Sequence, residues 1–419
     1  MVWQQAVGQR SETAHRANLS AIARELHAHG RLSRSALVAR TGLTRTTIRG
    51  LIGEFAAAEL VSEERPAPLG VPGRPSPLVR LEPEGGVVLA LEIAVDSLAA
   101  AYVGLGGVVI DRIRVDRPRA HLSVDEIGSD LAALAGQLRL PQRARGALMG
   151  IGVAVVGIVR RSDGFVSVAP NLGWRDVPLG ARLARALQTN LPINVANEAD
   201  LGALAEHRRG AGVGAEHLLF VSGEVGVGGG MIVAGAAAVG AAGYGGEIGH
   251  MPVNPTGVAC GCGSSGCWET EVGERALLAL AGRDPSGGAA EVDGVLGAAQ
   301  AGDARALAAL DSVGRWLGIG LAGLVNLLDP ERIILGGLFG RVHPYVARRI
   351  EEELDRRALA APRQLVRVVP ARLGIDAPLI GAAELALQAF LDDPAAWLRP
   401  RRPTAAAGQR LSGGVEGVA

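Results

Sequence analysis

The chain has 419 residues, more than a single hydrophobic core usually serves, so we expect at least two domains. Hydrophobic residues make up 48% of the chain and charged residues 20%, which is the composition of a soluble globular protein. Because 42 basic residues balance 42 acidic ones, the whole-chain charge excludes a generally basic protein, and any surface for nucleic acid must be local.

The sequence predicts neither export nor a membrane span. The first thirty residues include charges at Arg10, Glu12 and Arg16, which leaves no apolar core for a signal peptide. Residues 225–246 carry no charge over about the length of a membrane helix. Their nine glycines favour a hairpin and loops over a helix. We therefore expect a cytoplasmic protein that does not interact with a membrane.

Residues 18–60 are predicted to form three short helices. Ser33 and Thr44 suit the N-caps of the second and third helices, placed at 34–40 and from 45 to about 59. The first and third helices each have an apolar face at helical spacing, made of Leu19, Ile22, Ala23 and Leu26 in the first and Ile48, Leu51, Ile52 and Phe55 in the third.

A two-stranded wing is predicted after the helices, from strands at 60–62 and 78–81 separated by a stretch rich in proline and glycine. We therefore assign residues 1–81 to a winged helix-turn-helix. Its recognition helix enters the major groove of DNA, and Arg74 of the wing enters the minor groove. The predicted DNA-contacting residues of the recognition helix are Thr44, Arg45, Thr46, Thr47 and Arg49. The alternative for its two arginines is a solvated helix face.

Residues 86–395 alternate strands and helices. Strands at 87–93, 99–103 and 108–115 begin one block, and strands at 218–222 and 231–234, after a helix at 199–209, begin a second. Two similar blocks imply two α/β lobes with a cleft between them. Residues 396–419 have few apolar anchors, and we expect a disordered tail there.

All three cysteines lie within eight residues, at Cys260, Cys262 and Cys267, which favours a metal site over a disulfide framework. His250, ten residues before the first cysteine, is the natural fourth ligand. A site of one histidine and three cysteines is closed, so the predicted cofactor is a structural zinc ion. The alternative is a chance cluster of three reduced thiols.

Two motifs carry a family resemblance. Residues 246–250 read Gly-Glu-Ile-Gly-His, and 260–269 read Cys-x-Cys-Gly-x-x-Gly-Cys-x-Glu. Together they resemble the ROK family, named for repressors, open reading frames and sugar kinases. Further matching segments are 170–174, 195–198, 205–206, 226–230 and 334–337, and residues 33–42 and 73–75 resemble the DNA-binding half of the repressor branch. The resemblance implies an α/β fold with a two-lobed, actin-like ATPase domain over 86–395.

The resemblance also implies a sugar pocket, because carboxylates, amides and an imidazole can bind several sugar hydroxyls at once. Zinc would fix one ring nitrogen of His250 and leave the other for a hydroxyl. The implied sugar-binding residues are Asn171, Asn197, Glu198, Glu247, His250 and Glu269. The alternative for Glu247 and Glu269 is that they solvate the ends of loops.

The kinase motifs are altered. Kinases of the family have Asp-x-Gly-Gly-Thr after the first strand, where residues 92–96 here read Glu-Ile-Ala-Val-Asp. Glu224 replaces a common threonine in the second phosphate loop, and Glu198 replaces the catalytic aspartate. Without the two glycines, the backbone cannot approach a phosphate closely. A carboxylate about 4 Å from a phosphate charge repels it by about 4 kcal/mol at an effective dielectric of about 20. We therefore expect no catalytic residue and no enzymatic activity.

The sequence thus predicts a sugar-responsive transcriptional repressor. Its expected partners are an inverted-repeat operator in double-stranded DNA, a sugar or sugar-phosphate effector, and further copies of itself in a homodimer or homotetramer. The first alternative is a sugar kinase that transfers phosphate from ATP to a hexose and carries an accessory DNA-binding domain. The second is a scaffold whose helical domain binds protein partners.

Overall fold

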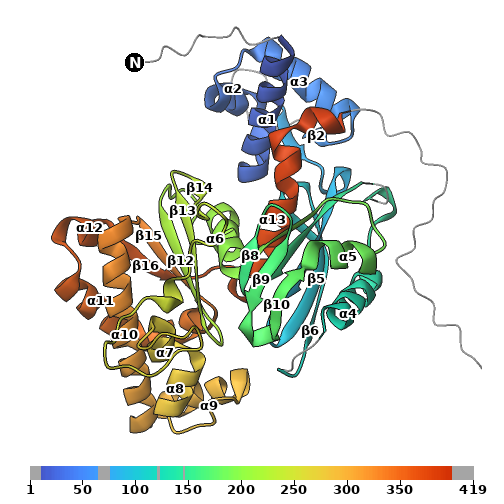
Figure 1. The fold of residues 1–419 in the computed structure, drawn as a ribbon. Coiled ribbons are helices and arrows are strands. Elements are labelled where there is room, and N and C mark those ends of the chain that lie inside the picture. Colours follow the sequence, from blue (N-terminus) through green and yellow to red (C-terminus); the bar gives the residue numbers. More distant parts are fainter. Residues whose placement is uncertain (1–10, 65–75, 120–122, 145–146, 399–419) are drawn as a thin grey trace, which may run out of the picture.

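The computed structural model describes residues 11–64, 76–119, 123–144 and 147–398. An N-terminal helical domain sits on the first of two lobes, and each lobe is built on a five-stranded sheet (Figure 1). The α/β class and the two-lobed arrangement predicted from the sequence are therefore confirmed.

The N-terminal domain contains α1 (Ser11–His29), α2 (Arg34–Thr41) and α3 (Arg45–Ala57). Both predicted N-caps form: Ser33 Oγ accepts from the Ala36 amide at 3.0 Å, and Thr44 Oγ1 accepts from the Thr47 amide at 3.2 Å. These bonds satisfy amides that lack a partner inside the helix. The apolar residues predicted to face inward are buried in one core.

The wing has one strand more than predicted. β2 (Val61–Glu64) and β3 (Leu78–Leu81) pair as expected, and β1 (Arg31–Ser33), between α1 and α2, adds to the free edge of β3. The prediction of two strands was wrong because three residues between two helices carry too little periodicity to be read as a strand. Arg74 lies outside the described residues.

The first lobe holds a sheet of order β11-β7-β4-β5-β6. Its strands are β4 (Val87–Ile93), β5 (Ser97–Gly104), β6 (Val108–Asp116), β7 (Leu148–Val155) and β11 (Ile193–Asn197). A second, small sheet contains β8 (Ile158–Arg160), β9 (Phe165–Ala169) and β10 (Trp174–Pro178), and the helices are α4 (Val124–Gln137) and α5 (Leu179–Ala186). The short 3-10 helices are η1 (Pro83–Gly85), η2 (Leu105–Gly107), η3 (Gln142–Ala144) and η4 (Pro170–Leu172).

The second lobe repeats this topology with the order β14-β13-β12-β15-β16. In both sheets three antiparallel strands are followed by two strands parallel to the central one. The strands are β12 (Leu218–Gly223), β13 (Val227–Val233), β14 (Ala236–Ala237), β15 (Arg332–Gly336) and β16 (Arg367–Pro370). The helices are η5 (Ile248–His250), α7 (Trp268–Val272), α8 (Glu274–Leu280), α9 (Gly288–Gln300), α10 (Ala304–Leu328), α11 (Gly337–Arg357), α12 (Ala360–Leu365) and η6 (Gly374–Asp376).

Strand β13 begins at Val227, four residues before the predicted start, and therefore includes the glycine run of 228–230. The run was read as loop because glycine is unfavourable in strands. It is strand here because a helix packs directly over it: a Cβ on Gly230 would collide with the carbonyl oxygen of Ala199. The expectation that 225–246 forms a hairpin and loops, and no membrane helix, is confirmed.

Two helices connect the parts of the molecule. α6 (Glu198–Arg209) follows β11 and packs on β12 and β13 of the second sheet, and α13 (Ala377–Asp392) returns to pack on α6, β4 and β7. Figure 1 shows α13 running from between the lobes to the N-terminal domain, where α1 packs against it. The N-terminal domain and the first lobe therefore share a continuous apolar core.

Two segments, Ala304–Leu328 and Gly374–Asp392, are long and apolar enough to cross a membrane by composition alone. More than half of the most apolar 18-residue window in each is buried inside the protein, at 61% and 56%, so we interpret both as core helices.

The fold extends beyond the predicted start of a disordered tail at 396. η7 (Pro394–Trp397) packs against α1 and α13, with Trp397 and Leu398 against the N-terminal core. Residues 396–398 thus belong to the fold, and the expectation was wrong for them because three residues carry little pattern. Residues 399–419 lie outside the described part of the chain.

Candidate functional site

The three cysteines and His250 meet as the sequence predicts. Their ligand atoms all lie within 4.8 Å of one another. His250 Nδ1 is 3.7 Å from Cys260 Sγ, and Cys262 Sγ is 3.6 Å from Cys267 Sγ. Cys260 and Cys267 are buried, whereas Cys262 is exposed at the tip of the loop. Three thiols and an imidazole at this separation can enclose one tetrahedral metal ion.

Two of the predicted sugar-binding carboxylates flank the metal-ligand cluster. Glu269, in α7, accepts a hydrogen bond from Cys260 Sγ at 3.0 Å and lies 3.6 Å from His250 Nδ1. Glu247 lies on the other side of the imidazole, 4.0 Å from Nε2. His250 therefore faces the cysteines with Nδ1 and has Nε2 directed toward Glu247. The predicted arrangement, one ring nitrogen toward a metal and the other available to a ligand, is compatible with this geometry.

Asn197 caps a helix and holds a neighbouring loop, in addition to its predicted role in binding sugar. Its Oδ1 accepts from the amides of Ala199 and Asp200 at 2.7 and 3.3 Å, which caps α6. Its Nδ2 donates to the Gly157 carbonyl at 2.9 Å. Because one amide hydrogen remains, Asn197 can still donate a single bond to a ligand. Sequence reasoning missed the cap, although Asn before a helical run is its usual signal.

Glu198 opens α6 and lies near three other acidic groups. Burial raises the pKa of Glu198 well above its ordinary value, and Glu224, Glu92 and Asp96 raise it further by repulsion. Asn171, the remaining predicted residue, lies in the short helix η4 and is exposed. Within the described residues it forms no hydrogen bond with the other five. The structure therefore groups Glu247, His250 and Glu269, and it places Asn197 and Glu198 together at the start of α6.

The turn at 92–96 is closed by the protein's own groups. Glu92 accepts two bonds from Arg114, at 3.1 and 2.8 Å, and Arg114 also donates to Ser97 Oγ at 3.1 Å. The amide of Ala94 donates to the carbonyl of Ser97 at 3.1 Å, so that amide is not free for an anion. Both carboxylate oxygens of Glu92 are therefore already paired with Arg114.

A second set of ion pairs joins the two lobes. Asp96, in the same turn, lies 3.2 Å from Arg119, and Arg119 donates to both oxygens of Glu274 at 2.6 and 3.1 Å. Glu274 belongs to α8 of the second lobe and is 5% exposed. Sequence reasoning missed Arg114 and Arg119. The signal was two pairs of alternate arginines along and just beyond β6, at 112 and 114 and at 117 and 119, opposite the two carboxylates of the 92–96 turn.

Glu224 lies at the start of α11, where its Oε1 contacts the position that a Cβ on Gly337 would occupy. The positive end of a helix dipole attracts an anion, so the protein supplies its own carboxylate there. Crowding by neighbouring atoms, followed by repulsion from Asp96 and Glu92, raises the pKa of Glu224 to about 7, although the residue is exposed at the surface.

The recognition helix α3 presents two arginines without partners. Arg45 and Arg49 are exposed and form no ion pair with any described residue. Thr46 is exposed as well, whereas Thr44 and Thr47 hydrogen-bond each other at 2.9 Å as part of the helix cap. The other six arginines in the described part of this domain all form ion pairs: Arg16, Arg24, Arg31, Arg34, Arg40 and Arg80.

Comparison with known proteins agrees with the motifs. The model of the ROK family matches residues 88–389. The xylose repressor of Bacillus spizizenii is 29% identical over 383 residues, which covers 90% of this chain and 96% of the repressor. The glucokinase of Streptomyces coelicolor is 31% identical over 319 residues, which covers 72% of this chain and 98% of the glucokinase.

A solved structure shows the same architecture over most of the length. The crystal structure of a ROK family transcriptional regulator, a homolog of the E. coli MLC protein, superimposes with a TM-score of 0.72 at 25% identity. The superposition covers 90% of this chain and 97% of that regulator.

Proposed function

The chain belongs to the ROK family, and on that premise we propose that it is a sugar-responsive transcriptional repressor that binds DNA through α3. The match to the xylose repressor covers 90% of the chain, so it extends beyond the ROK domain into the helix-turn-helix, whereas the glucokinase match covers 72%. The observation that carries the proposal is the pair Arg45 and Arg49, which lack ion-pair partners within the described chain on a helix shaped to enter a major groove.

Arg45, Thr46 and Arg49 are the proposed base-reading residues, because arginine can bond guanine in a bidentate way and threonine can contact a thymine methyl. Thr44 and Thr47 would instead fix the end of the helix against the DNA backbone. We assign Arg74 to the minor groove on sequence grounds alone. The operator is an inverted repeat bound by a homodimer or homotetramer in the cytoplasm, since paired helix-turn-helix units match paired half-sites.

The effector is a sugar or sugar phosphate, bound between the lobes. Glu247, Glu269 and His250 Nε2 form the core of the proposed pocket, with Glu198 and one Asn197 amide hydrogen at the start of α6 and Asn171 as a further contact. The metal is a structural zinc ion held by His250, Cys260, Cys262 and Cys267. It supplies no open coordination position, and its role is to hold the imidazole so that Nε2 points at a sugar hydroxyl.

We also propose that the chain does not transfer phosphate. The two-bond pair of Glu92 with Arg114 and the carboxylate of Glu224 at the start of α11 support this, because they fill positions that a nucleotide phosphate would need. A carboxylate about 4 Å from a phosphate charge costs on the order of 4 kcal/mol at an effective dielectric of about 20. The glucokinase relatives favour the rival, a kinase with an accessory DNA-binding domain.

A direct test is fluorescence anisotropy with labelled DNA from upstream of the protein's own gene, at fixed salt. We expect saturable binding that is resistant to excess unrelated DNA and is weakened by a sugar identified in a thermal-shift screen, because a ligand of the native state raises its melting temperature. Binding no tighter than to unrelated DNA would contradict the proposal.

A further inference from the structure

Helix α6 joins the proposed sugar pocket to the DNA-binding domain. It starts at Glu198 and ends at Arg209, so it spans about 18 Å. Most of its residues are buried, and it is tightly held on two sides. A Cβ on Gly230 of β13 would collide with the Ala199 carbonyl, and one on Gly381 of α13 would collide with the Leu201 carbonyl. A shift at one end of such a helix moves the other end as well.

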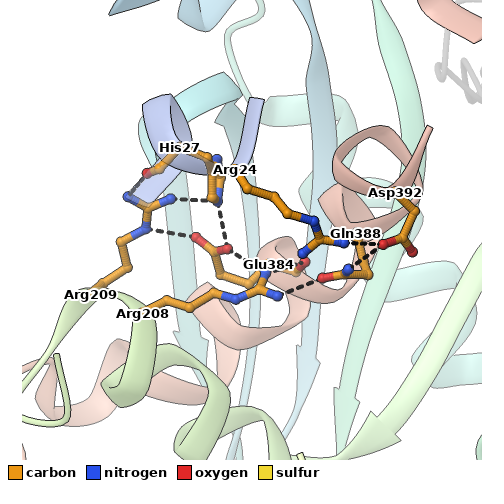
Figure 2. A network of polar contacts seen from close by, with 7 residues as sticks. All are labelled: Arg24, His27, Arg208, Arg209, Glu384, Gln388 and Asp392. Atoms are coloured by element: carbon orange, nitrogen blue, oxygen red, sulfur yellow. Dashed lines mark hydrogen bonds and ion pairs between the residues drawn. The ribbon is translucent and has the colours of Figure 1, made fainter. Parts of the chain in front are cut away.

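The far end of α6 meets α1 through a buried carboxylate (Figure 2). Glu384 of α13 is 1% exposed and lies 2.7 Å from His27 Nε2 on α1. It accepts from Arg209 Nε at 2.8 Å and from Arg208 Nη1 at 2.9 Å. Three helices thus share one carboxylate, and they are separated by more than 170 residues in sequence.

Arg209 is the member of this cluster that binds the backbone of the DNA-binding domain. Its Nη1 donates to the carbonyl of His27 at 2.8 Å, one of the last carbonyls of α1, which have no partner inside the helix. Its guanidinium also packs on Gly107 in η2, where a Cβ would lie 2.6 Å from it. Arg209 is therefore enclosed by α1, α13 and the β5–β6 connection, so it cannot move independently of them.

Arg208, the adjacent residue, has a different set of partners. It donates to Glu384 and to Gln388 Oε1, at 2.9 and 2.5 Å, and both acceptors belong to α13 (Figure 2). No hydrogen bond or ion pair joins Arg208 to α1 within the described residues. The two arginines thus share one carboxylate, but of the two only Arg209 also bonds directly to α1.

Because its groups are charged and buried, no single group can leave this cluster without a large energetic cost. Burial opposes the charge on Glu384, but His27, Arg209 and Arg208 outweigh burial and hold the pKa of Glu384 well below its ordinary value. Burial lowers the pKa of His27, and the contact with Glu384 opposes this effect. Separating any one of these groups leaves an uncompensated buried charge or donor, so the cluster moves as a unit or breaks at a large cost.

We propose that Arg209 is the positioning residue through which the sugar cleft sets the orientation of the helix-turn-helix. A ligand at the Glu198 end displaces α6, and the bonds from Arg209 to His27 and Glu384 carry that displacement to α1. This inference rests on the proposed function. It assigns the transmission of the signal to a named contact, separate from the residues that bind sugar or DNA.

The test compares Arg209→Gln with Arg208→Gln, using D-xylose and D-glucose as the probes. Calorimetry measures the affinity for each sugar, and anisotropy measures operator affinity with and without it. We expect Arg209→Gln to bind the active sugar within about twofold of wild type but to lose at least nine-tenths of the sugar-induced change in operator affinity. Arg208→Gln should keep that change, because it weakens the same carboxylate without touching α1.

An Arg209→Gln protein that responds to sugar as wild type does would overturn the coupling role and leave the proposed function intact. If the wild type binds its operator but responds neither to these two sugars nor to any sugar from the thermal-shift screen, the proposed sugar response fails and this inference fails with it. Should Arg209→Gln not melt cooperatively, Arg209→Lys replaces it. Lysine keeps the charge beside Glu384 but lacks the fork that reaches Glu384 and the His27 carbonyl together, so the same loss of response is expected.

Discussion

Glu92 and Arg114 form a two-bond ion pair across the first sheet, with oxygen–nitrogen distances of 3.1 and 2.8 Å. The two residues lie on β4 and β6, with β5 between them, and Glu92 is 3% exposed. The carboxylate near the end of the first strand of this lobe is thus paired by the protein itself.

The first prediction follows from that pair. We expect no sugar-dependent formation of ADP from ATP with D-glucose or D-xylose, because Glu92 is paired and Glu224 fills the start of α11. A coupled assay for ADP, with the Streptomyces coelicolor glucokinase as positive control, measures this. Turnover of about 1–100 s⁻¹, the ordinary range for kinases, would contradict the account and favour the bifunctional alternative.

The second prediction concerns the metal. Freshly purified protein should contain about one zinc ion per chain by mass spectrometry, as expected for a closed site of four ligands. Cys262→Ser should lower the zinc content and abolish the response to sugar, because His250 loses the ion that fixes its ring. Ser264→Ala, in the same loop but outside the ligand set, is the control and should keep both. Wild-type protein without zinc would show that the four side chains are only a thiol cluster.

The third prediction concerns DNA reading. Arg45→Ala should weaken operator binding by about 1–3 kcal/mol and relax specificity at one base position, if the arginine bonds a base edge. Arg348→Ala removes the same charge from α11, where the side chain is 79% exposed, and should change operator affinity little. Equal losses from both variants would indicate a nonspecific charge effect.

The fourth prediction uses the pH dependence of stability. Burial, with a smaller contribution from Glu247, raises the pKa of Asp200 to about 7, while unfolding returns it to its ordinary value of 3.8. The folded state therefore holds a proton that the unfolded state has lost, so stability falls as pH rises from about 4 to 7. Asp200→Asn should not lose this stability, and the loss in wild type reaches roughly 4 kcal/mol as an upper limit.

Urea unfolding at pH 5 and pH 8 measures the effect. The stability of Asp200→Asn relative to wild type should increase between these two values. Asp125→Asn changes a side chain that is 73% exposed, and its free energy of unfolding should differ from that of wild type by the same small amount at both pH values. A difference for Asp200→Asn that does not change with pH would mean that the carboxyl is ionised in the folded protein from the acid range upward.

Local features of the fold were predictable from the sequence, and long-range pairings were not. Ser33 and Thr44 were predicted as helix caps because a cap depends on a few neighbouring residues. The metal ligands were predictable because they are one short motif and a histidine ten residues away. β1 was missed because it is a strand only through its pairing with the edge of β3. Ser33 pairs with Leu78, and the 44 residues between them leave no local pattern that predicts the pairing.

In the candidate site, too, the local motifs were predictable from the sequence and the long-range contacts were not. Its carboxylates were found by motif, but the partners of those carboxylates were not. Arg114 reaches Glu92 over an intervening strand, and His27 reaches Glu384 across 357 positions. No periodicity in the sequence links such residues, because their proximity is a product of the tertiary fold.

The central claim is that a sugar bound beside the metal cluster controls operator binding. Operator affinity of wild type and Glu247→Ala, measured at fixed salt with and without the sugar that stabilises the wild type, tests it most directly. We expect the variant to bind the operator as wild type does without sugar, and to keep that affinity when sugar is added, because only a ligand contact is lost. A Glu247→Ala protein that releases DNA at the wild-type sugar concentration would contradict the account and place the sensing pocket elsewhere.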